Sequence, residues 1–159
     1  MNVEKMNSKA LIRLIVTVIF FLVSKGSDAQ SSQIAEVKVR LFFQYSGEFS
    51  QPLNGKEVLW NVMAGGGDVT EPTTSAFVDI VVSGLPNTYV AKQAVDLLVK
   101  NGRTGKIVER QRGRIGIYGP SGETHVGFWL RSFSCDPVIL VVSTAGSSKS
   151  LTLPFRCGE

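Results

Sequence analysis

The sequence predicts an all-β chain that folds as an antiparallel two-sheet sandwich of about eight strands. Short runs rich in Val, Ile, Leu and Phe recur along the chain, and some of them alternate strictly between apolar and polar residues. Turn residues separate these runs about every eight to twelve positions. No segment carries a strong helical pattern, so a helix-containing class is disfavoured.

The first 29 residues are expected to be a signal peptide. Three basic residues precede a ten-residue apolar run at 14–23, and small residues at Ser27 and Ala29 occupy the positions that a signal peptidase reads. An uncleaved anchor is the alternative, but spanning a bilayer takes about 20 apolar residues. We therefore expect one secreted or periplasmic domain over 30–159, with no transmembrane span after signal cleavage.

Three strands are expected in the first half of the mature chain. Residues 36–43 begin with clean alternation, which predicts a half-buried strand. A short apolar run at 57–63 predicts a second strand, and the β-branched run at 76–82 predicts a third, more central one. The glycine- and proline-containing segments between these runs predict loops.

The segment 91–100 is ambiguous, because its apolar residues suit either one helix face or a strand. Asn-Gly follows it directly and a strand-like run resumes, so we favour a hairpin of 95–100 with 106–112 over a helix. Further strands are expected at 114–118 and 124–133.

The C-terminal end predicts a closing hairpin that is centred on Gly146. This centre pairs residues whose numbers sum to 292, namely Val141 with Leu151, Ile139 with Leu153, and Cys135 with Cys157. All six are odd-numbered, so all six are expected on one apolar face. Pro154 cannot donate to a strand ladder, which predicts an edge position for the last strand.

The two cysteines are expected to form a disulfide between Cys135 and Cys157, because paired cysteines in an exported chain usually do. Buried free thiols are the alternative. The strand pattern resembles immunoglobulin-like and fibronectin-like domains in general architecture. The cysteines depart from the immunoglobulin plan, since they would join neighbouring strands rather than distant ones. The resemblance therefore implies an architecture and no particular family.

Charge is unevenly distributed along the mature chain. The whole chain carries a formal +4, of which the leader supplies +2; residues 30–99 sum to −3 and residues 100–159 to +5. Six cations fall within the fifteen residues 100–114. If 106–114 is a strand, one face carries four of them, which are Lys106, Arg110, Arg112 and Arg114.

This basic face is either an ordinary solvated surface or an anion-binding surface for acidic glycans, phospholipid head groups or an acidic partner. Export and a mature net charge of only +2 argue against nucleic acid as the partner.

Catalysis and metal binding find little support. His125 is the only histidine, and no serine occupies a Gly-x-Ser-x-Gly elbow. A single histidine without a Cys-x-x-Cys pair excludes a recognisable zinc site. Asp68 and Glu71 are weak calcium candidates without EF-hand spacing. We therefore expect no catalytic residue, no metal and no cofactor.

The expected function is a non-enzymatic binding domain whose partner is an envelope or extracellular protein or a polyanionic surface. A carbohydrate-binding module and a small secreted enzyme that uses His125 are the alternatives. Against the carbohydrate module, most aromatics in apolar runs are expected in the core, namely Trp60, Phe77, Phe128, Trp129, Phe133 and Phe155. Tyrosines near predicted loop ends could line a ligand surface, namely Tyr45, Tyr89 and Tyr118.

Overall fold

The chain forms seven strands in two antiparallel sheets, in a computed structural model that describes residues 32–131 and 135–157. The predicted signal peptide and Phe133 lie outside the described residues. The strands are β1 (Gln33–Phe42), β2 (Ser75–Ser83), β3 (Ala94–Asn101), β4 (Ile107–Arg114), β5 (Glu123–Arg131), β6 (Val138–Ser143) and β7 (Ser148–Leu153). The described part of the chain contains no helix that could cross a membrane.

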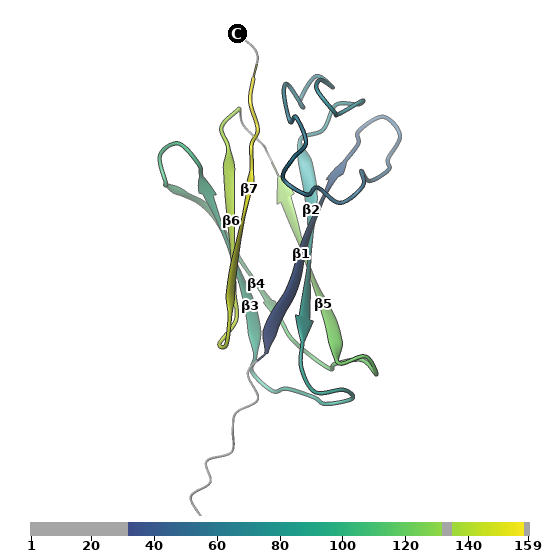
Figure 1. Cartoon of the computed structure of the whole chain (residues 1–159), viewed down its shortest axis with the longest axis vertical. Helices are drawn as coiled ribbons and strands as arrows, with labels where there is room; N and C mark the ends of the chain where they lie inside the picture. Colours follow the sequence, from purple (N-terminus) through teal and green to yellow (C-terminus); the bar gives the residue numbers. More distant parts are fainter. Residues whose placement is uncertain (1–31, 132–134, 158–159) are drawn as a thin grey trace, which may run out of the picture. The chain divides into compact units, whose positions relative to one another are not determined.

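The sheets have the orders β1-β2-β5 and β4-β3-β6-β7, and their strands run roughly vertically in Figure 1. One cluster of buried side chains draws on both sheets and includes Val39, Val78, Ile80, Val95, Leu97 and Leu140. Alternate residues of each strand supply these side chains, as the period of two requires. The arrangement confirms the predicted all-β class and is consistent with a β-sandwich.

The two sheets also meet at their edges. Gln111 of β4 donates to the carbonyl of Trp129 in β5 at 2.9 Å. On the opposite side, the ammonium of Lys149 in β7 donates to the carbonyl of Ala35 in β1 at 2.6 Å. Gly113 allows β4 and β5 to approach each other closely, because a Cβ at this position would lie 2.3 Å from a methyl group of Val126.

The strand order departs from the constant-type immunoglobulin plan, in which the fourth strand belongs to the first sheet. Here β4 pairs with β3 in the second sheet. The expected likeness to immunoglobulin or fibronectin domains therefore stays a prediction about general architecture.

The hairpin predicted from 95–100 and 106–112 is confirmed as β3 and β4, and the helix alternative for 91–100 is wrong. Two predicted strands are absent from the described structure. The segment 57–63 forms turns and a single parallel bridge from Trp60 to Arg156. The segment 114–118 continues β4 only at Arg114, because the chain then turns to pair with 87–93.

The register predicted for the C-terminal hairpin is wrong by one residue. Observed pairs sum to 291, with Leu140 opposite Leu151. The turn closes between Thr144 and Ser147, where the Thr144 amide donates to the Ser147 carbonyl at 2.8 Å. The Thr144 hydroxyl also accepts the Ser147 amide at 3.1 Å, which fixes a two-residue turn rather than one centred on Gly146.

A shift of one residue exchanges the faces of a strand. The even-numbered residues of β6 therefore face the core, and Ile139 and Val141 lie half-buried on the outer face. In β7 the inward residues are Leu153, which is fully buried, and Leu151, which is partly buried and packs against the core. The expected edge position of the last strand is confirmed, since β7 ends the four-stranded sheet just before Pro154.

The disulfide between Cys135 and Cys157 is present despite the wrong register, with a Cα–Cα distance of 4.9 Å. The ladder stops at Leu153, and the tail beyond it pairs with the long β1–β2 loop instead. The Arg156 amide donates to the Leu59 carbonyl at 2.9 Å. The disulfide thus joins the β5–β6 connection to a tail that holds this loop.

The observed register predicts unequal costs for the same change at two neighbouring positions of β6. Val142→Ala removes methyl groups from a side chain that is only 1% exposed, so it should lower the free energy of unfolding by about 2 kcal/mol. Val141→Ala, on the outer face, should cost less than about 1 kcal/mol. Urea unfolding of both variants measures the difference. A larger cost at Val141 would contradict this register.

Loss of the disulfide should destabilise the domain. Closing a loop of this length stabilises a fold by about 3 kcal/mol, so Cys135→Ser should lower the free energy of unfolding by that amount and leave Cys157 reactive. Thermal unfolding and a thiol titration measure both effects. Two titratable thiols in the untreated wild type would contradict the bridge.

Candidate anion-binding site

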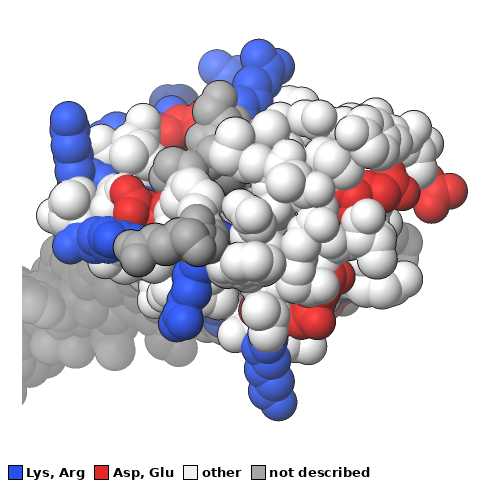
Figure 2. Space-filling model, turned by 90° about the horizontal axis from the view of Figure 1, so that it is seen from above, with Lys and Arg blue, Asp and Glu red and all other residues white. Residues whose placement is uncertain are grey.

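Charged side chains are unevenly distributed on one end of the molecule. Figure 2 looks onto the end that carries the β3–β4 turn and the long β1–β2 loop. Basic side chains project from its upper, left-hand and lower edges, with some acidic ones among them, whereas the charged side chains at the right-hand edge are acidic. The described structure therefore keeps the charge asymmetry that the sequence carries.

Three of the four predicted site residues share one face of β4. Arg110, Arg112 and Arg114 lie opposite Leu98, Asp96 and Ala94 of β3, respectively, and all three are exposed. Ala94, Asp96 and Leu98 alternate along β3 with the residues that face the core, which include the buried Val95 and Leu97. The three arginines, here called the arginine row, therefore point to solvent from an edge strand.

Lys106 does not belong to the arginine row. Val99 pairs with Glu109 and Lys100 pairs with Ile107, so Val108 is an extra residue in β4 and forms a bulge. The bulge breaks the alternation that the arginines follow. Lys106 precedes the strand and takes part in the turn, where its carbonyl accepts the Asn101 amide at 2.9 Å.

The arginine row is only weakly neutralised. Arg112 forms an ion pair with Asp96 at 3.6 Å, and its side chain is 70% exposed. An exposed pair of this length contributes little and leaves the guanidinium accessible. Arg110 and Arg114 have no ion-pair partner among the described residues.

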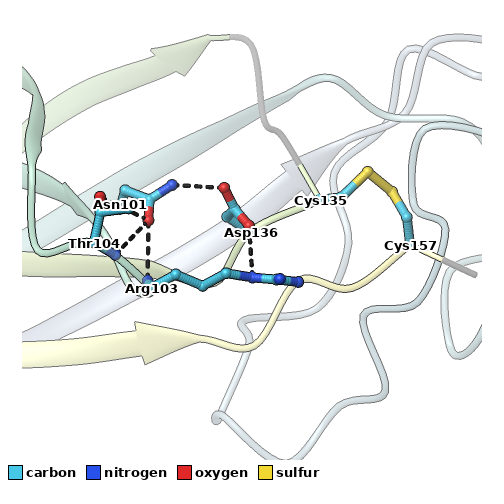
Figure 3. Close-up of polar contacts among 6 residues, drawn as sticks. All are labelled: Asn101, Arg103, Thr104, Cys135, Asp136 and Cys157. Atoms are coloured by element: carbon cyan, nitrogen blue, oxygen red, sulfur yellow. Dashed lines mark hydrogen bonds and ion pairs between the residues drawn. A yellow bond between two sulfur atoms is a disulfide. The ribbon is translucent and has the colours of Figure 1, made fainter.

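Arg103, another cation of the basic stretch, is already committed to the fold. Its Nε lies 2.7 Å from Asp136 Oδ1 (Figure 3). Asn101 donates to the other oxygen of the same carboxylate at 2.7 Å, and its own side-chain oxygen accepts the amides of Arg103 and Thr104. Asp136 follows Cys135, so this network ties the hairpin tip to the disulfide segment.

A pocket of about 520 Å³ opens at the Arg114 end of the arginine row. Arg112, Arg114 and the buried Ile115 line one side. The other side comes from the loop before β3, which contributes Tyr89, Ala91, Lys92, Gln93 and, at the start of the strand, Ala94. The pocket therefore gathers three cations and one aromatic ring. Its volume falls within the range of about 300–1,000 Å³ typical of ligand pockets.

Sequence reasoning missed Lys92, which lies eighteen positions before Arg110, the first residue of the arginine row. Its backbone has a φ of 65°, in the left-handed region that lysine rarely adopts. Asn87 in the same loop has a φ of 55°. Non-glycine residues in this region carry strain, and such strain is concentrated at functional sites.

Only some of the aromatic residues predicted to lie in the core are buried. Phe128 and Phe155 are buried, as expected, but Trp60 is 44% exposed. Phe77 and Trp129 lie on the outer face of the three-stranded sheet, where they contact each other and the rings of Phe42 and Phe49. Strand alternation explains this placement, because the neighbours of Phe77 and Trp129 along each strand fill the core. Tyr118 is buried too, and its hydroxyl bonds to Ser32.

His125 lies on that same outer face and is 59% exposed. Its Nδ1 is 2.9 and 3.1 Å from the carboxylate oxygens of Asp79, which orients the ring. A general base also needs a nucleophile. Ser83 lies two residues along β2 from Val81, the register partner of His125, but its hydroxyl bonds to the Gln33 carbonyl at 3.4 Å.

The carboxylates of the long loop serve as backbone acceptors. Asp68 accepts the Val58 amide at 2.7 Å and Glu71 accepts the Ser46 amide at 2.9 Å. Within 32–131 and 135–157, no group of three or more His, Cys, Asp or Glu side chains is placed to hold a metal ion.

Comparison of the chain with known protein families and with curated proteins gives no match. The geometry of the pocket and the arginine row is therefore the basis of the functional assignment below.

The strain at Lys92 predicts a difference between two substitutions. Lys92→Gly relieves the left-handed conformation, whereas Lys92→Ala retains it. Glycine avoids the energetic cost of the left-handed conformation but loses more conformational entropy on folding than alanine does. The net difference in the free energy of unfolding should favour the glycine variant by about 0.5–1 kcal/mol. Urea unfolding compares the two. An alanine variant of equal or greater stability would show that the position is unstrained.

Proposed function

We propose that this chain is an extracytoplasmic, non-enzymatic binding domain that holds polyanionic ligands on the arginine row. The observation that carries the proposal is the alignment of Arg110, Arg112 and Arg114 on the exposed face of an edge strand, with the pocket at one end. The predicted signal peptide and the disulfide support a secreted or periplasmic location.

The spacing of the row suits an extended ligand. Alternate residues of a strand are about 6.8 Å apart, so the three guanidinium groups follow a line of roughly 14 Å. Each guanidinium can form two parallel hydrogen bonds with a carboxylate, sulfate or phosphate. A chain that carries repeated anionic groups can therefore contact several arginines at once, whereas a single small anion contacts one.

Long-range attraction supports the same function. Residues 100–159 carry a net +5 and residues 30–99 a net −3, so an anionic ligand is attracted towards the part that holds the arginine row. The ion pairs form at exposed positions, and salt screens such pairs over about 10 Å at 0.1 M ionic strength. Binding should therefore weaken steeply as salt rises.

The decisive experiment compares two charge-reversal variants of the mature domain on immobilised heparin. Arg110→Glu with Arg114→Glu removes both arginines of the row that lack an ion-pair partner. Arg40→Glu with Arg131→Glu makes the same change in net charge on the outer face of the other sheet, where both arginines are exposed. At 50 mM salt, the first variant should lose about tenfold in affinity and the second less than about twofold.

Equal losses in the two variants would mean that net charge, and not the arginine row, determines binding. A wild-type domain that binds neither heparin nor polyglutamate at 50 mM salt would contradict the proposed function. Thermal unfolding of each variant verifies that the fold is retained.

A further inference from the structure

We infer that the pocket beside Arg114 takes an acidic sugar unit, so that the polyanion bound by the arginine row is a glycan. This inference rests on the proposed function and adds the class of ligand. It is carried by the pairing of an exposed aromatic ring with three cations around one pocket.

Tyr89 provides a flat apolar surface at the rim. Tyr89 is 69% exposed, so the fold leaves most of this residue uncovered. A sugar ring presents C–H groups on one face and polar groups at its edge. The C–H face can pack on the face of an aromatic ring. A phosphate or a simple peptide carboxylate would need the cations but would leave this ring unused.

The platform that carries Tyr89 is held in place before any ligand binds. Tyr89 forms a bridge with Ile117, and the flanking amide of Val90 donates to the Gly116 carbonyl at 3.2 Å. Further along, the Ile115 amide donates to the Gln93 carbonyl at 3.0 Å. Backbone hydrogen bonds thus hold the loop before β3 against the segment after β4, so ligand binding would not have to order this loop.

The cations lie where a charged substituent of the sugar would extend. Lys92 belongs to the same loop as Tyr89, whereas Arg112 and Arg114 approach from β4. A carboxylate or sulfate on the sugar can pair with a guanidinium while the ring rests on Tyr89. The next acidic units would then continue along the row towards Arg110. Lys92 precedes β3, has a left-handed backbone conformation and lines the pocket.

The test measures binding of a heparin-derived tetrasaccharide and of polyglutamate, which has charge but no sugar rings, to wild type and three tyrosine variants. Tyr89→Ala should weaken tetrasaccharide binding about fivefold and leave polyglutamate binding within about twofold. Tyr89→Phe keeps the ring and should bind the tetrasaccharide like wild type. Tyr45→Ala is the matched control, because Tyr45 is 81% exposed but lies in the β1–β2 loop.

The outcomes separate the two proposals. If Tyr89→Ala binds the tetrasaccharide as tightly as wild type, or weakens both ligands equally, the sugar pocket is wrong while the polyanion-binding function stands. If wild type binds neither ligand, both proposals fail. Amide chemical-shift changes at 89–94 and 110–115 on addition of the tetrasaccharide would support the pocket, and the absence of shifts at 89–94 would overturn it.

Discussion

The shared core of the two sheets determines where the arginine row lies. Burial of Val95 and Leu97 of β3 between the sheets fixes which side of that strand faces inward. Because β4 pairs with β3 in register, the same constraint sends Arg110, Arg112 and Arg114 outward. Burial of three guanidinium groups, two of them without an ion-pair partner, would cost far more than the core could offset. The apolar pattern of one strand thus positions the charges of its neighbour.

Covalent and polar links then hold the basic hairpin at its tip. The disulfide fixes Cys135, and the next residue, Asp136, binds both Asn101 and Arg103. Gly102 packs so closely on Pro137 that a Cβ there would lie 2.7 Å from its ring. These contacts neutralise one cation of the basic stretch and leave the row free. The pairing of Arg103 with Asp136 is one reason why the accessible site contains fewer cations than the six of the basic stretch.

The sequence predicted the β3–β4 hairpin and the common face of three arginines, because both follow from strand periodicity. It could not predict that Lys106 leaves this face, since a bulge depends on pairing with the partner strand. The C-terminal register failed for a related reason, as side-chain hydrogen bonds of Thr144 selected the turn. Local patterns marked Tyr89 only as one of three tyrosines near loop ends and did not single out Lys92, because only tertiary pairing of 87–93 with 115–118 brings both residues to β4.

The two charge signs have different roles in this molecule. The carboxylates of Asp68 and Glu71 in the long loop accept hydrogen bonds from backbone amides. The loop forms no strand ladder, so its amides need side-chain acceptors of this kind. Arg110 and Arg114 have no comparable partner in the described structure, and Arg112 has only a long exposed one. A cation that stabilises nothing within the fold is available to a ligand. This asymmetry is why the basic side, rather than the acidic side, is the one assigned to binding.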